Sequence, residues 1–83
     1  MAKKIIWSDE ARADVRAIDR STALGLLEGL ARFAFTESGD VKQLQGYDPI
    51  QFRLRLGDYR VRFRNLGDSI EILRVRHRKE AYR

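Results

Sequence analysis

Apolar and polar residues alternate from Gln51 to Arg64, and Gly57-Asp58 is the only interruption. Successive side chains on a β-strand point to opposite faces, and glycine in the first position of a two-residue loop suits a type II′ turn. The stretch therefore predicts a β-hairpin with a two-residue loop. Its apolar face would consist of Phe52, Leu54, Leu56, Tyr59, Val61 and Phe63, and its opposite face of Gln51, Arg53, Arg55, Arg60, Arg62 and Arg64.

The register of this hairpin would place arginine against arginine. A two-residue loop pairs Arg55 with Arg60. The same register pairs Arg53 with Arg62. Like charges directly opposite each other destabilise a sheet, whereas a flat set of guanidinium groups suits an anionic ligand such as phosphate. We interpret the arginine face as a binding surface; the alternative is a solvated charged face without a ligand.

The N-terminal half predicts one strand and two helices. Residues Lys3–Trp7 form a short strand candidate, and Ser8 then provides an N-cap that is followed by two acidic residues. The apolar spacing that follows predicts a helix over Asp9–Ile18. A second capping pair, Ser21-Thr22, precedes a longer apolar helix over Thr22–Phe35. The two helices would form an α-hairpin, with the longer one lying on a sheet.

The remaining segments complete the topology. Residues Thr36–Asp48 read as a loop, and Asn65–Asp68 as a turn that follows the hairpin. Ser69–Val75 is apolar at positions on both faces and predicts a central strand, and Arg76–Arg83 is a polar tail. We expect an α+β fold of order β-α-α-β-β-β in a single domain over residues 1–83. The α-hairpin would cover one face of a small, mainly antiparallel sheet.

The charge distribution indicates which kind of partner the protein binds. The first 40 residues carry six basic and seven acidic side chains, whereas residues 41–83 carry eleven basic and five acidic ones. A basic C-terminal half is typical of a nucleic-acid footprint or of a surface that meets an acidic partner. The chain has no cysteine and no apolar run long enough for a signal peptide or a membrane span, so we expect a cytoplasmic protein.

The last strand and the C-terminal tail contain further candidate functional residues. If the last strand pairs with Tyr59–Arg64, it delivers basic and aromatic residues to the arginine face, namely Arg74, Arg76, His77, Arg78 and Tyr82. Aromatic rings among cations can hold single-stranded RNA, and imidazole can transfer protons near neutral pH. A lone histidine is more often a surface or capping residue, and a tyrosine near a terminus is more often a core anchor. The sequence has no metal-ligand spacing, Ser-His-Asp set or glycine-rich phosphate loop, so RNA cleavage would need attack by the RNA's own 2′-hydroxyl.

Three segments resemble the RelE/ParE superfamily of bacterial toxins. They are the opening I-x-W-S-D-E-A, the central F-R-L-R-L-G-D-Y-R-V-R-F and the ending V-R-H-R-x-E-A-Y. The resemblance implies a type II toxin–antitoxin system in which an antitoxin, which we expect to be acidic, masks the basic face. RelE-like members cut mRNA in the ribosomal A site, and ParE-like members inhibit DNA gyrase without enzymatic activity. Neither activity implies a metal or a cofactor.

The resemblance also implies roles for single residues. Arg60 matches the arginine at the scissile phosphate, and Tyr82 matches a tyrosine that stacks on the target base. The pair His77-Arg78 matches a basic pair at the end of the last strand. Arg76 and Arg78 are two candidates for the one phosphate-binding role at this end. The expected catalytic set is Arg60, His77, Arg78 and Tyr82, and the expected ribosome- or RNA-binding set is Arg53, Arg55, Arg62, Arg64, Arg74 and Arg76. The leading hypothesis is a ribosome-dependent mRNA endonuclease; a gyrase inhibitor and a non-toxic binding module are the alternatives.

Overall fold

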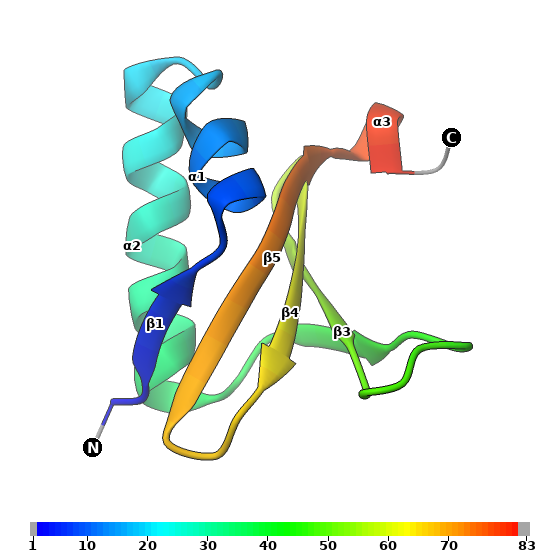
Figure 1. Cartoon of the computed structure of the whole chain (residues 1–83). Helices are drawn as coiled ribbons and strands as arrows, with labels where there is room; N and C mark the ends of the chain where they lie inside the picture. The colour runs from blue at the N-terminus through cyan, green and yellow to red at the C-terminus, as the bar shows by residue number, and fades with distance from the viewer. Residues whose placement is uncertain (1, 82–83) are drawn as a thin grey trace.

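The computed structural model describes residues 2–81, and its two longer helices lie together on one side of a sheet (Figure 1). The α+β class is confirmed. The sheet has the strand order β1-β5-β4-β3-β2, in which β1 runs parallel to β5 and the other neighbours are antiparallel. The elements are β1 (Lys4–Trp7), α1 (Asp9–Arg16), α2 (Arg20–Thr36), β2 (Asp40–Gln43), β3 (Phe52–Leu56), β4 (Tyr59–Asn65), β5 (Ser69–His77) and α3 (Arg78–Ala81).

The central hairpin has the predicted register. Arg55 pairs with Arg60 across β3 and β4, and Leu56 faces Tyr59 next to the loop. Gly57 has a φ of +57°, and Asp58 is not in the positive-φ region. This combination fits a type II′ turn, because a type I′ turn needs positive φ at both central residues. The last strand is also central, as predicted, since β5 lies between β1 and β4.

The prediction of a loop over Thr36–Asp48 is wrong in its middle part. Strand β2 pairs antiparallel with β3 and adds a fifth strand at the edge of the sheet. All four of its residues are exposed, so no buried side appears in the hydrophobic pattern. The ladder with β3 orders this segment, and its charged residues suit an edge strand because they discourage further pairing.

Several predicted boundaries also differ. Helix α1 ends at Arg16, two residues earlier than predicted, and α2 begins at Arg20 because Asp19 accepts a hydrogen bond from the Thr22 amide. At its other end, α2 stops where Glu37 takes a left-handed conformation with a φ of +55°. Strand β5 extends to His77, and the predicted polar tail includes the short helix α3.

The core lies between α2 and the apolar face of the sheet. Phe33 of α2 meets Phe63 of β4 edge to face, with ring centroids 5.4 Å apart. Buried residues of α1, α2 and the three central strands complete the core: Ala11, Leu26, Leu30, Ala34, Leu54, Val61, Ile70, Ile72 and Val75. Helices α1 and α2 both pack on this face of the sheet, so they leave the opposite face of the hairpin uncovered. Among residues 2–81, no helix is long and apolar enough to cross a bilayer.

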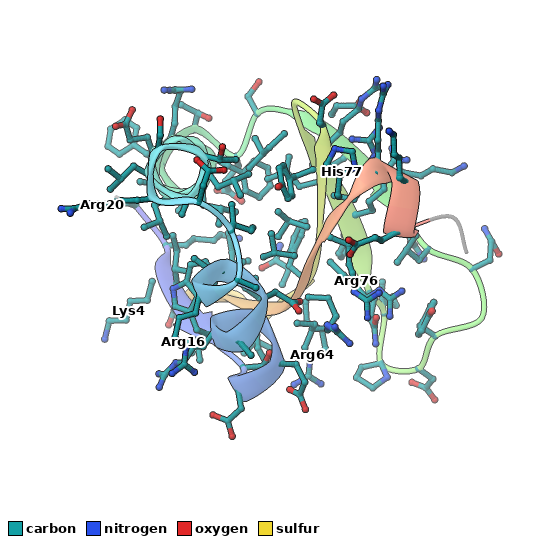
Figure 2. All side chains as sticks on the ribbon, turned by 90° about the horizontal axis from the view of Figure 1, so that it is seen from above. Lys4, Arg16, Arg20, Arg64, Arg76 and His77 are labelled. Carbon is teal, nitrogen blue, oxygen red and sulfur yellow. The ribbon has the colours of Figure 1, made fainter. Side chains whose placement is uncertain are left out.

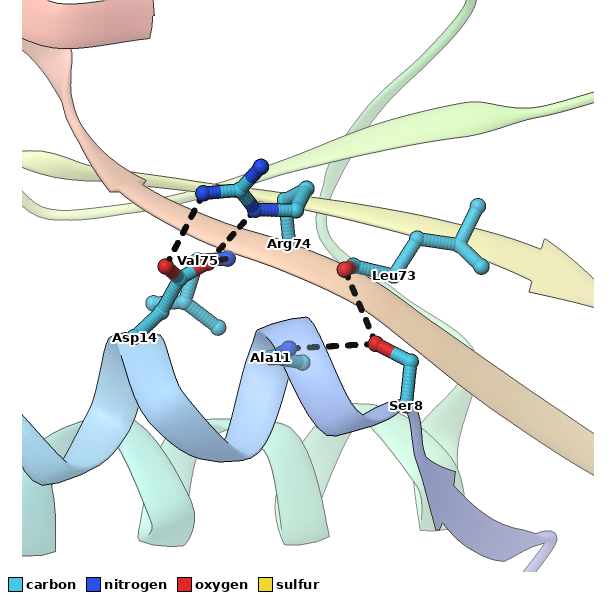
Figure 3. Close-up of polar contacts among 6 residues, drawn as sticks. All are labelled: Ser8, Ala11, Asp14, Leu73, Arg74 and Val75. Carbon is cyan, nitrogen blue, oxygen red and sulfur yellow. Dashed lines mark hydrogen bonds and ion pairs between the residues drawn. The ribbon is translucent and has the colours of Figure 1, made fainter.

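The edge of β5 beyond the end of β1 is covered by α1 (Figure 3). The Ser8 hydroxyl caps α1 by accepting a hydrogen bond from the Ala11 amide at 3.1 Å, and it donates to the Leu73 carbonyl at 3.0 Å. Three residues further along α1, Asp14 accepts a hydrogen bond from the Val75 amide at 2.9 Å. Side chains of α1 thus replace the missing strand, because buried or half-buried backbone groups need partners.

Asp14 also holds the side chain of Arg74. The Arg74 Nε and Nη2 atoms donate to the two carboxylate oxygens of Asp14 at 2.9 and 3.1 Å. Burial by itself would raise the pKa of Asp14, but the hydrogen bonds from Arg74 and Val75 and the charge of Arg74 outweigh it and hold that pKa below its usual value. The same pairing raises the pKa of Arg74. Asp14 is therefore a charged partner for Arg74 throughout the neutral range.

Candidate functional site

A groove of about 550 Å³ lies on the uncovered face of the sheet. Its walls come from β2 and the loop after it, from β3, β4 and β5, and from α3. Six of the side chains around it are cationic and one is a carboxylate. The lining residues are Lys42, Gln43, Leu44, Gln45, Arg53, Arg60, Arg62, Arg74, Arg76 and Glu80.

Two rows of arginines cross the three central strands next to this groove. Paired residues on neighbouring strands share a face. The first arginine row is Arg53, Arg62 and Arg74, and the second arginine row is Arg55, Arg60 and Arg76. Strand β2 adds Lys42 beside the first row and Asp40 beside the second. The predicted arginine face therefore exists, and it extends over β5.

A β-bulge aligns β5 with the hairpin. The pairing of β4 with β5 shifts by one residue between Arg62 and Phe63, so Leu73 is the extra residue on β5. A bulge lets the residues on either side of it keep the same face despite the odd spacing. Ile72 and Val75 therefore both point into the core, and Arg74 and Arg76 both join the open face. The bulge explains why β5 has buried apolar residues at both even-numbered and odd-numbered positions.

Arg60 is the most deeply placed cation of the groove. Only 6% of its surface is exposed. Its Nη1 atom donates hydrogen bonds to the carbonyls of Gly57 and Tyr59 at 3.1 and 3.0 Å, and its Nε atom is buried with no partner within residues 2–81. No carboxylate of these residues lies within 4 Å of it. A buried charge without a counter-charge is costly, so the guanidinium of Arg60 is set for an external anion.

The remaining arginines differ in how far their charges are compensated. Arg74 is bound by Asp14, as described above, and Arg53 Nη2 lies 3.7 Å from Asp40 Oδ1. In the part of the chain that the structure describes, three others make no ion pair: Arg55, Arg62 and Arg76. Arg55 is exposed and lies beside the groove rather than in its wall.

Arg64 follows Arg60 and Arg62 in the alternation of β4, but it lies outside the groove wall. It lies beyond the bulge and pairs with Glu71 across β4 and β5. The Arg64 Nε atom donates to Glu71 Oε1 at 2.7 Å. Figure 2 shows Arg64 well separated from His77, with Arg76 between them in the view. The carboxylate of Glu71 thus compensates the charge of Arg64 outside the groove wall.

The predicted place of His77 on the arginine face is wrong. His77 has the same parity as Val75, and its side chain lies on the side of the sheet that faces the helices. There its ring meets the Tyr59 ring edge to face, with centroids 5.3 Å apart. Its Nδ1 atom accepts a hydrogen bond from the Lys79 amide at 3.2 Å. Successive strand residues point to opposite faces, so His77 and Arg76 cannot enter the same groove.

Arg76 and Arg78, the two candidates for one phosphate-binding role, lie in different places. Arg76 lines the groove and pairs with Arg60 across the strands. Arg78 is exposed at the start of α3, where its amide donates to the Asp58 carbonyl at 2.7 Å and its Nε lies 3.7 Å from Asp58 Oδ1. The geometry favours Arg76 as the partner of Arg60. Tyr82 lies outside the described residues.

Sequence reasoning missed three residues of this region. Lys42 lines the groove from β2, and its signal was the weak alternation of Asp-Val-Lys-Gln, in which Val41 is the one apolar residue. Glu80 enters from α3 and is the one carboxylate of the described groove wall. Tyr47 lies in the loop between β2 and β3, with its ring centroid 5.2 Å from Arg62 Cζ. No signal in the sequence indicated Tyr47 or Glu80.

The groove can bind an extended polyanion. Two rows of guanidinium groups offer hydrogen-bond donors in fixed directions, which suits the recognition of phosphate oxygens. Glu80 is the side chain at the groove that can accept a proton. Within residues 2–81, no three side chains of histidine, cysteine, aspartate or glutamate are grouped as a metal site would require.

Comparison with solved structures shows the same fold in known toxins. The toxin of the archaeal RelE-RelB complex from Pyrococcus horikoshii OT3 is similar at 26% identity and a TM-score of 0.72, over 94% of this chain and 97% of that one. The RelB-RelE antitoxin–toxin complex from Methanococcus jannaschii matches at 23% identity and a TM-score of 0.73, over 93% and 94% of the two chains. The toxin–antitoxin complex RelBE2 from Mycobacterium tuberculosis matches at 24% identity and a TM-score of 0.73, over 93% and 99%.

The sequence itself matches one family over nearly its whole length. No curated relative matches it. The family model that does match covers residues 5–82 and describes the ParE toxin of the type II toxin–antitoxin system parDE. This range runs from the second residue of β1 through α3 and includes both arginine rows. The chain therefore belongs to the ParE toxin family, within the RelE/ParE superfamily of type II toxin–antitoxin toxins.

Proposed function

We propose that this toxin is a ribosome-dependent mRNA endonuclease that inhibits translation. The observation that supports it is the second arginine row, in which Arg60 is buried in a groove without a carboxylate partner among the described residues. A preorganised guanidinium in a partly dry site stabilises charge that develops on a phosphate. The similarity to the RelE of Pyrococcus horikoshii, at 26% identity, adds weight to an RNA substrate.

The proposed reaction uses the 2′-hydroxyl of the RNA as the nucleophile. The oxygen attacks the adjacent phosphate, a 2′,3′-cyclic phosphate forms as the bond from phosphorus to the 5′-oxygen of the next nucleotide breaks, and that leaving oxygen takes a proton from water. Arg60 and Arg76 neutralise the charge that builds on the phosphate, and the first arginine row orients the strand. Glu80 takes the role first expected of His77, accepting the proton of the 2′-hydroxyl, because His77 lies on the other face of the sheet.

We also propose a cognate antitoxin as the partner, by analogy with the toxin–antitoxin complexes that share the fold. An acidic segment of the antitoxin would cover the groove and compensate the unpaired second row. Affinity should then fall as salt rises, since exposed charges are screened over about 8–10 Å at physiological ionic strength. The proposed place of action is the cytoplasm, where the ribosome presents mRNA in its A site.

Induced expression of the chain in bacteria, followed by primer extension on a translated mRNA, tests this function. We expect growth arrest and cuts within codons that vanish when translation is blocked. Glu80→Gln should slow cleavage strongly, whereas the exposed Glu10→Gln should leave cleavage unchanged. Growth arrest with intact mRNA would contradict the nuclease.

Inhibition of DNA gyrase is the second candidate function. Two observations favour it: the matching family model is that of ParE toxins, and His77 does not face the groove. In this case the arginine rows would bind a protein surface, and no proton transfer would be needed. Broken plasmid DNA and an SOS response in cells with uncut mRNA would support this function. Harmless expression would contradict both toxins and leave a binding module.

A further inference from the structure

Tyr47 belongs to the loop between β2 and β3, which reaches away from the sheet (Figure 1). Forty per cent of its surface is exposed. Its ring lies against the guanidinium of Arg62, whose Cζ is 5.2 Å from the ring centroid. Within residues 2–81, no other aromatic ring packs against it. The ring therefore has a cation on one side and solvent around much of the rest.

The loop places this ring beside the ligand-binding wall. Residues 42–45 line the groove just before Tyr47, and Arg62 lines it from β4. Gly46, between them, has a φ of +81°, a conformation that residues with a side chain rarely adopt. This glycine turns the chain so that Tyr47 meets Arg62. The guanidinium of Arg62 thus contacts both the groove and the ring.

We propose that Tyr47 is a stacking platform for one base of a single-stranded RNA whose phosphates bind the arginine rows. This inference rests on the proposed RNA substrate. Phosphates in the groove would leave the bases at its rim, where an aromatic ring with free surface can stack on any base. The cation–π contact with Arg62 would hold the ring in place and reduce the freedom lost on binding.

Alternative explanations for Tyr47 are weaker. A tyrosine that serves the core buries its ring, as Tyr59 does in part against the helix-covered side. Tyr47 is not among the residues packed on the core, and no hydrogen bond of its hydroxyl is present among the described residues. Removal of the ring should therefore leave the fold intact. An acidic peptide would use the cations but would gain little from an exposed ring.

Fluorescence anisotropy with two labelled probes tests the proposal. One probe is a short single-stranded RNA, and the other is an abasic ribose-phosphate strand of the same length and charge. Tyr47→Ala should weaken binding of the RNA about tenfold and leave binding of the abasic strand unchanged, because one stacked base is lost. Tyr47→Phe should retain wild-type affinity. Phe35→Ala, which removes a 69% exposed ring on α2, is the matched control and should change neither.

Each other outcome overturns the proposal. Equal losses for both probes would mean that Tyr47 only positions Arg62. No loss with Tyr47→Ala, or equal wild-type affinity for the two probes, would mean that no base stacks there. Failure to bind either probe, or a loss confined to an acidic glutamate peptide, would exclude RNA at this rim. These results are separate from the proposed function, since wild-type mRNA cleavage on ribosomes is measured independently of Tyr47.

Discussion

The two arginine rows lie side by side on one face of the sheet, yet carboxylates compensate their charges to different extents. The first row is tied to carboxylates at both ends, at Arg53 by Asp40 and at Arg74 by Asp14. The second row makes no ion pair within residues 2–81, and its central member, Arg60, is buried. The first row thus contributes to the structure of the free toxin, whereas the second row has the uncompensated charge that the proposed binding of an anionic ligand requires.

This difference separates stability from function on one small surface. Folded proteins tolerate uncompensated buried charge where it is used for binding or catalysis. The Asp14–Arg74 pair, in contrast, joins α1 to β5 where no neighbouring strand is present. Substitutions in the two rows should therefore have opposite effects on activity and on the free energy of unfolding.

The largest expected effect comes from Arg60→Met. Loss of one donor that stabilises transition-state charge typically costs about 100–1,000-fold in rate, so cleavage of ribosome-bound mRNA should fall by that factor. The free energy of unfolding should stay the same or rise, because relief from burying a lone charge offsets the hydrogen bonds lost to Gly57 and Tyr59. Primer extension and urea denaturation measure the two effects.

Arg55→Met is the matched control for Arg60→Met, since Arg55 belongs to the same row but is exposed. Its effect on cleavage should be much smaller. If a folded Arg60→Met protein cleaves as fast as the wild type, or if it unfolds more easily by several kcal/mol, the second row does not have the role assigned to it.

Asp14→Asn tests the first row. The substitution weakens two hydrogen bonds to Arg74 and one to the Val75 amide, and it leaves the charge of Arg74 unpaired. Hydrogen bonds with a charged partner contribute about 1.5–3 kcal/mol, so the midpoint of thermal unfolding should fall by roughly 6–24 °C. Asp68→Asn, in an exposed turn, should have no such effect. Loss of activity without loss of stability in Asp14→Asn would contradict the distinction between the rows.

The same carboxylate predicts a dependence of stability on pH. The pKa of Asp14 is lowered in the folded protein, so the unfolded chain binds more protons between the folded and unfolded pKa values, and stability rises with pH there. The contribution is complete above the usual pKa of an aspartate, near 3.8, and is lost as pH falls through the lower folded value. Thermal unfolding followed from neutral pH down to acid should show this loss, and Asp14→Asn should flatten it.

Asp19 contributes in the same acid range, because hydrogen bonds from Thr22 at the start of α2 lower its pKa. Asp19→Asn keeps an N-cap acceptor and removes this titration, so it separates the two groups. A profile that Asp14→Asn leaves unchanged would assign the acid loss to Asp19 and to other carboxylates.

Local sequence patterns predict the two arginine rows better than they predict the residues that contact these arginines. Strict alternation and a glycine turn are enough to place Arg55 against Arg60. The bulge at Leu73 is not visible in the sequence, and it decides that Arg76 enters the groove and that His77 does not. Asp14 is 60 residues from Arg74, so no local pattern joins them. Strand β2 was missed because an exposed edge strand depends on its neighbour rather than on its own hydrophobic period.

Ser8 offers the smallest and sharpest test of how the first row is supported. Its hydroxyl accepts from the Ala11 amide and donates to the Leu73 carbonyl, so it ties the start of α1 to the bulge that aligns both rows. Ser8→Ala removes both bonds and should cost about 1 kcal/mol or slightly more, seen as a fall of about 4–8 °C in the unfolding midpoint.

Ser8→Asp separates the two bonds of Ser8. A carboxylate still caps the helix, but it cannot donate to the Leu73 carbonyl, and that oxygen would face a negative charge. If the cap alone matters, Ser8→Asp should be as stable as the wild type, and the bulge would be held by the strand ladder. If Ser8→Asp loses stability and also cleavage, then the bond to Leu73 keeps Arg76 in line with Arg60, and a contact on the helix side of β5 sets the geometry of the groove.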